Sequence, residues 1–275
     1  MLKKLLKYDF KALFKYWWIA AIVSVGLGII AGNCIPIVRS TKELPEILIV
    51  CSWLLIILAV IGVGIFAAFA TVMLFIRFYK NLFTDEGYLT FTLPVKRGTI
   101  LNSKIISGVV FTFITILVNL LDVGFIFGIG YRDKIFTKEF FEYFKDFVGE
   151  VFKEFGAYTY VYMLEVLLIF IACLILAALF LYICITLASI ITKKARVITS
   201  IGIYYGATCL FVFVSQLLLI FGANALGELI RGIPESTAKL LMALIALCFL
   251  LFILVLCGVM YVLEHYMIDR KLNLA

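Results

Sequence analysis

The sequence has few charged residues and lacks the motifs of the common enzyme classes. Asp, Glu, Lys and Arg make up only 15% of its 275 residues, whereas 65% of the residues are hydrophobic and the mean hydropathy is +1.18. A soluble domain could not bury so much apolar surface, so the composition predicts a polytopic membrane protein. The sequence contains no H-E-x-x-H, G-x-S-x-G or G-x-x-x-x-G-K-[ST] motif, so we expect neither a catalytic site nor a nucleotide-binding site in this chain.

The sequence also lacks the usual pattern of metal ligands or disulfide-bonded cysteines. Its single histidine is His265, and no two cysteines form a C-x-x-C pair. All seven cysteines lie in apolar runs, which favours small packed or lipid-facing side chains over a zinc or disulfide framework. We expect His265, which follows the last apolar run, to be an interfacial side chain. The cysteines are Cys34, Cys51, Cys173, Cys184, Cys209, Cys248 and Cys257.

Six long apolar runs are present, and each has the ~20 residues that are needed to cross a bilayer. The predicted fold class is therefore all-α: one transmembrane domain over residues 1–275, with six membrane-spanning helices. The spans are predicted at residues 17–38, 47–76, 105–130, 160–191, 197–222 and 238–263. The second and fourth exceed the required length and should tilt or project beyond the bilayer.

The distribution of basic residues predicts the orientation. The net charge of +7 resides in segments that flank the spans, which indicates contact with anionic lipid and a topological role rather than nucleic-acid binding. With both termini in the cytoplasm, the cytoplasmic segments carry fifteen basic and five acidic residues, against nine basic and ten acidic residues outside. We therefore expect both termini, and residues 77–104, to be cytoplasmic.

Residues 1–16 are predicted to form an amphipathic helix at the cytoplasmic membrane surface. Lysines recur at every fourth position and share one face, where they can meet anionic headgroups. Asp9 departs from this pattern because it falls on the apolar side of the helix. The surface lysines are Lys3, Lys4, Lys7, Lys11 and Lys15.

Residues 77–104 form the longest predicted cytoplasmic segment and carry turn signals. We expect short helices at residues 78–83 and 99–104, separated by an extended connector at residues 87–94, because Pro94 disfavours helix at the residue before it. A solvated loop that only fixes topology could be far shorter. We therefore favour a docking surface for a partner.

This segment resembles the permease subunits of bacterial ABC-2-type ABC transporters. The matching positions are Glu86-Gly87-Tyr88-Leu89, Leu93-Pro94, Lys96-Arg97 and Ser103-Lys104, set between the second and third spans. Such permeases commonly begin with an interfacial helix, which residues 1–16 resemble.

The resemblance implies a coupling segment that contacts a cytoplasmic dimer of ATP-binding subunits, with ATP and Mg²⁺ bound there and not in this chain. A second permease chain, identical or homologous, would complete the pathway in the bacterial plasma membrane. The residues that the resemblance assigns to coupling are Asp85, Glu86, Gly87, Tyr88, Leu89, Pro94, Lys96 and Arg97. The apolar spans favour export of a hydrophobic or amphipathic substrate.

Residues 131–159, predicted to lie outside, have the rhythm of an amphipathic helix. Phe140, Phe144 and Phe147 share one face, and charged residues of both signs occupy the other. We expect this helix to pack on the transmembrane bundle or lie at the outer interface, and a gating or substrate-sensing role is the alternative.

Two acidic residues lie within the spans, Asp122 in the third and Glu165 in the fourth. Intramembrane carboxyl groups usually face a polar cavity or a partner, so both are candidates for a transport pathway. A proton-coupled secondary carrier that uses Asp122 and Glu165 is the second function hypothesis, although no basic residue lies mid-span. A membrane subunit without transport activity, acting in immunity or sensing, is the third.

Three G-x-x-x-G pairs occur within the spans. Small residues four apart let helices approach closely, which favours packing within the subunit over a dimer interface. The pairs are Gly28/Gly32, Gly124/Gly128 and Gly202/Gly206.

Overall fold

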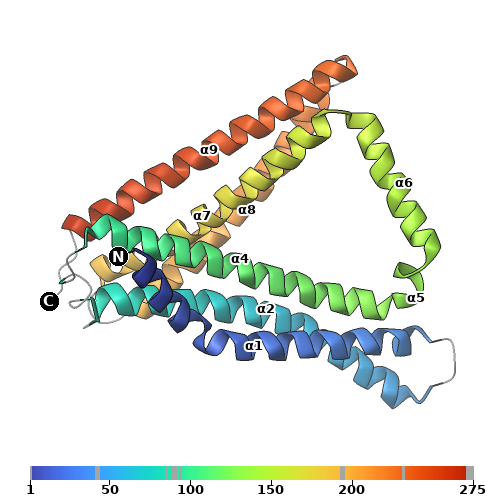
Figure 1. Cartoon of the computed structure of the whole chain (residues 1–275), viewed down its shortest axis with the longest axis horizontal. Helices are drawn as coiled ribbons and strands as arrows, with labels where there is room; N and C mark the ends of the chain where they lie inside the picture. The colour runs from blue at the N-terminus through green and yellow to red at the C-terminus, as the bar shows by residue number, and fades with distance from the viewer. Residues whose placement is uncertain are drawn as a thin grey trace. The chain divides into compact units, whose positions relative to one another are not determined.

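The computed structural model describes residues 2–40, 44–84, 86–87, 92, 95–192, 196–230 and 233–270. All regular secondary structure in these residues is helical (Figure 1). The helices are α1 (Leu2–Arg39), α2 (Glu46–Phe83), α4 (Arg97–Gly130), α5 (Arg132–Ile135), α6 (Lys138–Phe155), α7 (Tyr158–Ile191), α8 (Arg196–Ile230) and α9 (Glu235–Arg270).

Six stretches of these helices are long and apolar enough to cross a membrane. They are Leu2–Arg39, Glu46–Phe83, Arg97–Gly130, Tyr158–Ile191, Ile198–Gly222 and Ser236–Asp269. The predicted all-α class is therefore confirmed for the described residues, and six helices that could cross a membrane match the six predicted spans. The helices are longer than the apolar runs, since the flanking charged residues are themselves good helix formers.

The N-terminal helix and the first span form one continuous helix, α1, instead of two elements. No glycine or proline lies near residues 15–18, so nothing interrupts the backbone hydrogen bonds between the basic and apolar parts. Figure 1 shows the first turns of α1 set at an angle to the rest of the helix.

The ends of residues 77–104 are helical, as predicted, but they are the last turns of α2 and the first turns of α4. The prediction of an extended connector is wrong at Gly87 and Thr92, which both have helical backbone. At Gly87 the backbone N–H donates to the carbonyl of Thr84 at 2.7 Å, which closes a turn directly after α2. Asp85, Tyr88, Leu89 and Pro94 lie outside the described residues.

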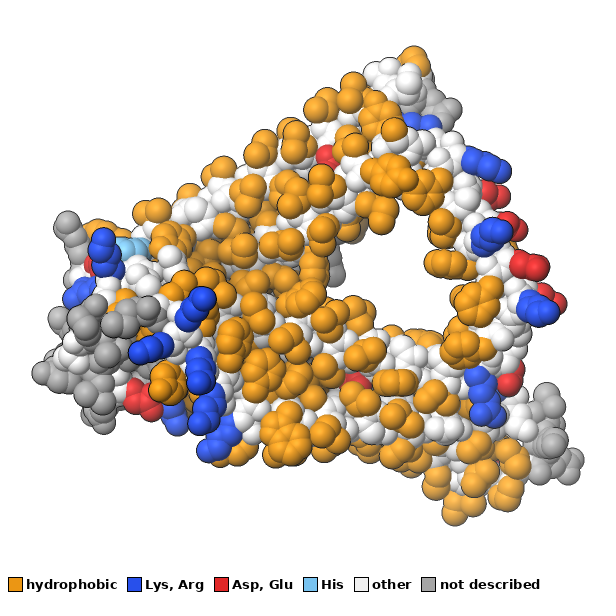
Figure 2. Space-filling model, viewed as in Figure 1, with side chains coloured by type: hydrophobic (Ala, Val, Ile, Leu, Met, Phe, Trp, Pro, Cys, Tyr) orange, Lys and Arg blue, Asp and Glu red, His pale blue; other side chains and the backbone are white. Residues whose placement is uncertain are grey.

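The predicted amphipathic helix in residues 131–159 is present as α6. None of its residues is buried, and Phe140, Phe144 and Phe147 are all exposed. Figure 2 shows charged side chains along one side of α6 and hydrophobic side chains along the other. At its C-terminal end Phe155 makes an edge-to-face contact with Tyr162 of α7, with ring centroids 5.8 Å apart.

The chain divides into two compact units, and the division falls inside α2, α4 and α6. The first unit comprises Met1–Phe78 and Asn102–Glu150. Its core includes Ala31, Ala59 and Ile126, from α1, α2 and α4, and an aromatic cluster around Trp17 and Phe111.

The second unit comprises Tyr79–Leu101 and Val151–Ala275. Within it α7 packs against both α8 and α9. Its core includes Ala172 of α7 with Leu250 and Ile253 of α9, so small and branched residues allow these two helices to approach closely.

Candidate functional site

A buried carboxylate in the first unit joins three helices. Asp9 of α1 is only 2% exposed, and its Oδ1 accepts hydrogen bonds from Lys104 Nζ of α4 at 2.5 Å and from Arg77 Nε of α2 at 3.2 Å. Lys104 is also buried, with 6% of its side chain exposed, whereas Arg77 is 25% exposed. Arg77 and Lys104 are the first and last residues of the predicted coupling segment, so one acid of the N-terminal helix ties down both ends of it.

The local sequence of α1 explains how Asp9 reaches this position. Asp9, Leu13 and Trp17 follow one another at intervals of four residues, and all three are buried along one stripe of the helix. A carboxylate on an otherwise apolar face needs cationic partners, because an unpaired buried charge would cost several kcal/mol. The apparent defect in the amphipathic pattern is thus the residue that makes the contact.

The five lysines of α1 point away from this cluster. Lys3, Lys4, Lys7, Lys11 and Lys15 are all exposed, and Figure 2 shows basic side chains gathered over the N-terminal part of α1. This exposure agrees with their predicted role at the membrane surface. On the opposite, buried face of α1, Trp17 donates a hydrogen bond from Nε1 to Thr115 Oγ1 at 3.1 Å.

Within the second unit, the start of α4 contacts the end of α9. Arg97 Nη1 donates to the carbonyl oxygen of Asp269 at 3.0 Å and lies 3.4 Å from its Oδ1. His265 Nδ1 lies 2.9 Å from Asp269 Oδ2, one helical turn away. Arg97, assigned by resemblance to ATPase coupling, therefore has an intrachain partner while half of its side chain stays exposed.

Three other residues that were predicted to contact an ATP-binding subunit are described: one is a buried glycine and two are exposed charged residues. Glu86 and Lys96 are both exposed, which a contact with another protein requires. Gly87 is buried, and a Cβ at this position would lie 2.7 Å from the carbonyl oxygen of Leu82. Any side chain would collide with this backbone, so only glycine fits the turn.

Asp122 lies in the first unit, where α4 contacts α1. It is fully buried, and its Oδ2 accepts a hydrogen bond from Ser24 Oγ at 2.6 Å. Oδ1 has no hydrogen-bond partner within the described part of the chain. One turn along α1, a Cβ on Gly28 would lie 3.3 Å from the carbonyl of Asp122. The Asp122 carboxyl group is therefore bonded to a side chain of α1.

Glu165 belongs to the second unit, so the structure does not bring the two predicted pathway acids into one compact body. Glu165 is 7% exposed, and its Oε2 has no partner among the described residues. The same unit contains a second buried acid that the sequence prediction placed in a cytoplasmic flank. Glu264 of α9 is fully buried and accepts a hydrogen bond from Thr186 of α7 at 2.7 Å.

A signal for Glu264 is present in the sequence. Buried residues of α9 recur as Leu250, Ile253, Glu264 and Ile268, on the 3.6-residue period of one helix face. Continuing the apolar stripe past the end of the hydrophobic run would have placed Glu264 on the buried face.

The glycine pairs have different surroundings. Gly28 and Gly32 pack against α4, and a Cβ on Gly32 would lie 2.8 Å from the carbonyl oxygen of Phe125. This confirms packing within the subunit for that pair. At the other two pairs, Gly124/Gly128 and Gly202/Gly206, a Cβ would meet no described atom within 4 Å.

Comparisons of the chain with protein-family models, with curated proteins and with solved structures found no match.

Proposed function

We propose that the chain is the membrane permease subunit of an ATP-driven transporter, coupled through residues 77–104 to a separate ATP-binding subunit. The observation that carries this proposal is the buried Asp9 carboxylate with its two cations, Arg77 and Lys104. A coupling segment must transmit force to the spans without deforming at its base. A shared ion cluster on three helices gives that base the required stiffness.

The lengths of α2 and α4 support the same mechanism. They contain 38 and 34 residues, so at 1.5 Å per residue they are roughly 57 and 51 Å long. A bilayer with its headgroups is only about 40–45 Å thick. Upright in a bilayer, both helices would extend beyond the membrane, and ATP-driven movement of the segment would tilt them between inward and outward states.

The exposed Glu86, next to the buried Gly87, and the exposed Lys96 are the residues that we assign to the ATPase contact. ATP and Mg²⁺ would be bound by the partner, because this chain has no nucleotide-binding motif. A dimer of such permeases in a bacterial plasma membrane, exporting a hydrophobic or amphipathic substrate, is the assembly that we propose.

The test is purification of the tagged chain from its native membrane, with identification of the co-purifying proteins. The proposal expects a stoichiometric chain with a Walker A motif, lost in the double charge reversal Glu86→Arg with Lys96→Glu. Glu142→Arg reverses another exposed acid, on α6; it is the matched control and should leave the association intact. No ATPase in the wild-type sample, even after crosslinking through a cysteine at residue 86, would contradict the proposal.

A proton-coupled carrier is the second candidate, and Asp122 is the observation that favours it. Its carboxyl group is buried beside a hydroxyl group, with no basic side chain within ion-pair distance among the described residues. Asp122→Asn keeps an acceptor oxygen for Ser24 but cannot exchange a proton. A carrier would lose proton-dependent flux in this variant, whereas an ATP-driven permease would retain its transport.

A further inference from the structure

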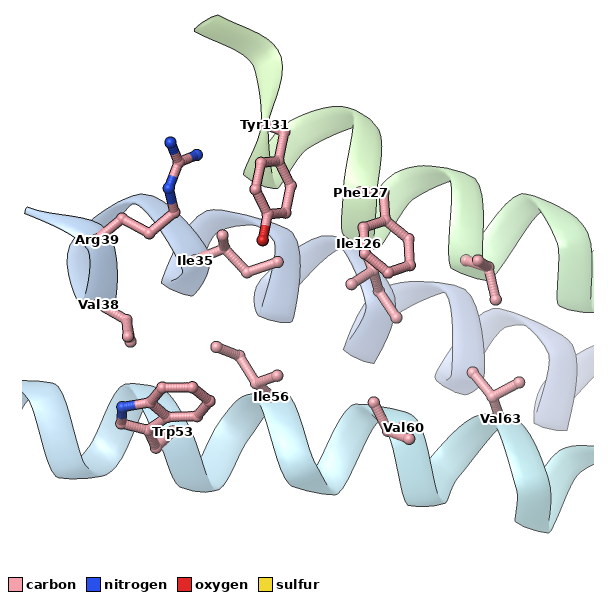
Figure 3. A pocket seen from close by; sticks show the side chains of 11 residues that line it. Ile35, Val38, Arg39, Trp53, Ile56, Val60, Val63, Ile126, Phe127 and Tyr131 are labelled. Atoms are coloured by element: carbon pink, nitrogen blue, oxygen red, sulfur yellow. The ribbon is translucent and has the colours of Figure 1, made fainter. Parts of the chain in front are cut away.

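The first unit contains an apolar groove, and Arg39 is the one basic residue among the described residues that line it. It lies between the last turns of α1, the first turns of α2 and the end of α4, and its volume is about 520 Å³ (Figure 3). Isoleucine and valine side chains such as Ile56, Val60 and Val63 form its walls. Arg39, Tyr131 and Trp53 lie together toward one end of it in Figure 3.

The Arg39 guanidinium is held in place at this end. It lies 4.6 Å from the ring centroid of Tyr131, a cation–π contact that orients the group without neutralising it. The side chain is exposed, and no acidic residue lies within ion-pair distance of it in the described ranges. A guanidinium so placed binds phosphate oxygens through several N–H donors at once.

The length of the groove matches one leaflet of a bilayer. Trp53 and Val63 are ten residues apart on α2, which is roughly 15 Å along the helix axis. Half of the ~30 Å hydrocarbon core of a bilayer is the same distance. Because α1 ends at Arg39 and tryptophan and tyrosine prefer the membrane surface, the charged end of the groove belongs at headgroup level.

We propose that this groove binds one anionic phospholipid of the surrounding bilayer. Its phosphate lies at the Arg39 guanidinium, and one acyl chain lies along the valine and isoleucine walls. The apolar wall alone would accept any acyl chain, so Arg39 supplies the selectivity for an anionic headgroup. The inference does not depend on the transport function proposed above.

The position of Trp53 provides a direct measurement, because bromine atoms on an acyl chain quench tryptophan fluorescence on contact. The purified full-length chain is reconstituted in phosphatidylcholine vesicles that contain a minor fraction of brominated phosphatidylglycerol or of brominated phosphatidylcholine. The signal of Trp53 is the difference between the wild-type protein and Trp53→Phe, so Trp17 and Trp18 need not be changed. We expect brominated phosphatidylglycerol to quench Trp53 at about fivefold lower mole fraction than brominated phosphatidylcholine, the preference expected of one basic residue at an anionic surface.

Two variants make the test specific. Arg39→Gln should abolish the preference, whereas Arg132→Gln, which removes an exposed arginine of α5 that does not line the groove, should preserve it. Equal quenching by the two lipids would mean ordinary annular lipid and would overturn the proposal. A preference that survives Arg39→Gln, or that disappears equally in Arg132→Gln, would also overturn it. So would an absence of quenching because a second copy of the chain fills the groove.

Discussion

Asp9 Oδ1 and Lys104 Nζ form a buried ion pair 2.5 Å apart that joins α1 to α4, across 95 residues of sequence. The side chains are 2% and 6% exposed, so water screens the pair little. Arg77 of α2 shares the same oxygen from a more exposed position. The pair thus fixes the N-terminal helix to the base of the segment that we propose for coupling.

Replacing Asp9 by alanine should destabilise the protein strongly. The substitution leaves the Lys104 ammonium buried without its counter-charge, and breaking a buried pair in this way typically costs about 3–5 kcal/mol. We expect a fall in the unfolding temperature of roughly 10 °C in detergent. A thiol-reactive dye can follow the transition because Cys34 and Cys184 are buried in the folded chain.

Two further variants test whether the loss of stability comes from the unpaired buried charge or from mutation in general. Asp133→Ala removes an exposed acid, 3.8 Å from Arg132, and should change stability by less than about 1 kcal/mol. Asp9→Leu combined with Lys104→Met removes both charges and should recover much of the loss. If Asp9→Ala unfolds at the same temperature as Asp133→Ala, the ion pair does not hold the three helices together.

Two glycines of α1 should respond in opposite directions to the same substitution. A Cβ on Gly32 would lie 2.8 Å from the carbonyl oxygen of Phe125, so Gly32→Ala must push α1 away from α4, at a cost of about 1–3 kcal/mol. Gly26 has no described atom within 4 Å of its Cβ position. Gly26→Ala should therefore gain up to about 1 kcal/mol from helix propensity. The same dye measurement compares the two, and equal effects would argue against close packing at Gly32.

The sequence predicted the helical class and the six spans because apolar length and basic flanks are local properties. It did not predict that Asp9 meets Arg77 and Lys104, since no spacing rule links residues on three different helices. The prediction noted Asp9 as an irregularity of the amphipathic pattern, and burial of its charge explains that irregularity. An acidic residue that interrupts an apolar helix face therefore predicts an ion pair with a basic residue at the end of a neighbouring span.

The burial of Glu264 escaped the sequence prediction for a different reason. The predicted last span ended at residue 263, where hydropathy falls, and Glu264 was assigned to the cytoplasmic flank. The helix continues to Arg270, and its buried face continues with it. Hydropathy reports where lipid begins and ends, whereas helix periodicity reports which side chains contact the protein.

The hydrogen bond from Thr186 to Glu264 should contribute measurably to the packing of α7 on α9. Thr186→Val keeps the shape of the side chain but leaves Glu264 Oε1 without its 2.7 Å donor, at a cost of about 1–3 kcal/mol. Thr208→Val is the matched control, since the Thr208 hydroxyl donates only to the carbonyl of Tyr204 in its own helix. Thermal unfolding should show a lower unfolding temperature for Thr186→Val and an unchanged one for Thr208→Val. Equal stability of the two variants would assign no role to the interhelical bond.

The orientation of the chain can be tested with two reporters in the full-length protein. The excess of basic residues predicts that a C-terminal green fluorescent protein folds in the cytoplasm and fluoresces. An alkaline phosphatase domain inserted between Phe136 and Thr137, ahead of α6, should be active because this segment is predicted to lie outside. The exchanged reporters, phosphatase at the C-terminus and fluorescent protein ahead of α6, should both be silent.

An inverted result would separate the two proposals. It would place residues 77–104 outside the cell, where no ATP-binding subunit can reach Glu86 and Lys96, and the transporter proposal would then fail. The lipid groove needs only a leaflet of the right depth beside Arg39, so its binding of an anionic phospholipid would remain, with the site moved to the cytoplasmic leaflet. Since anionic lipid is concentrated in that leaflet, the preference measured through Trp53 would then act on the more abundant pool.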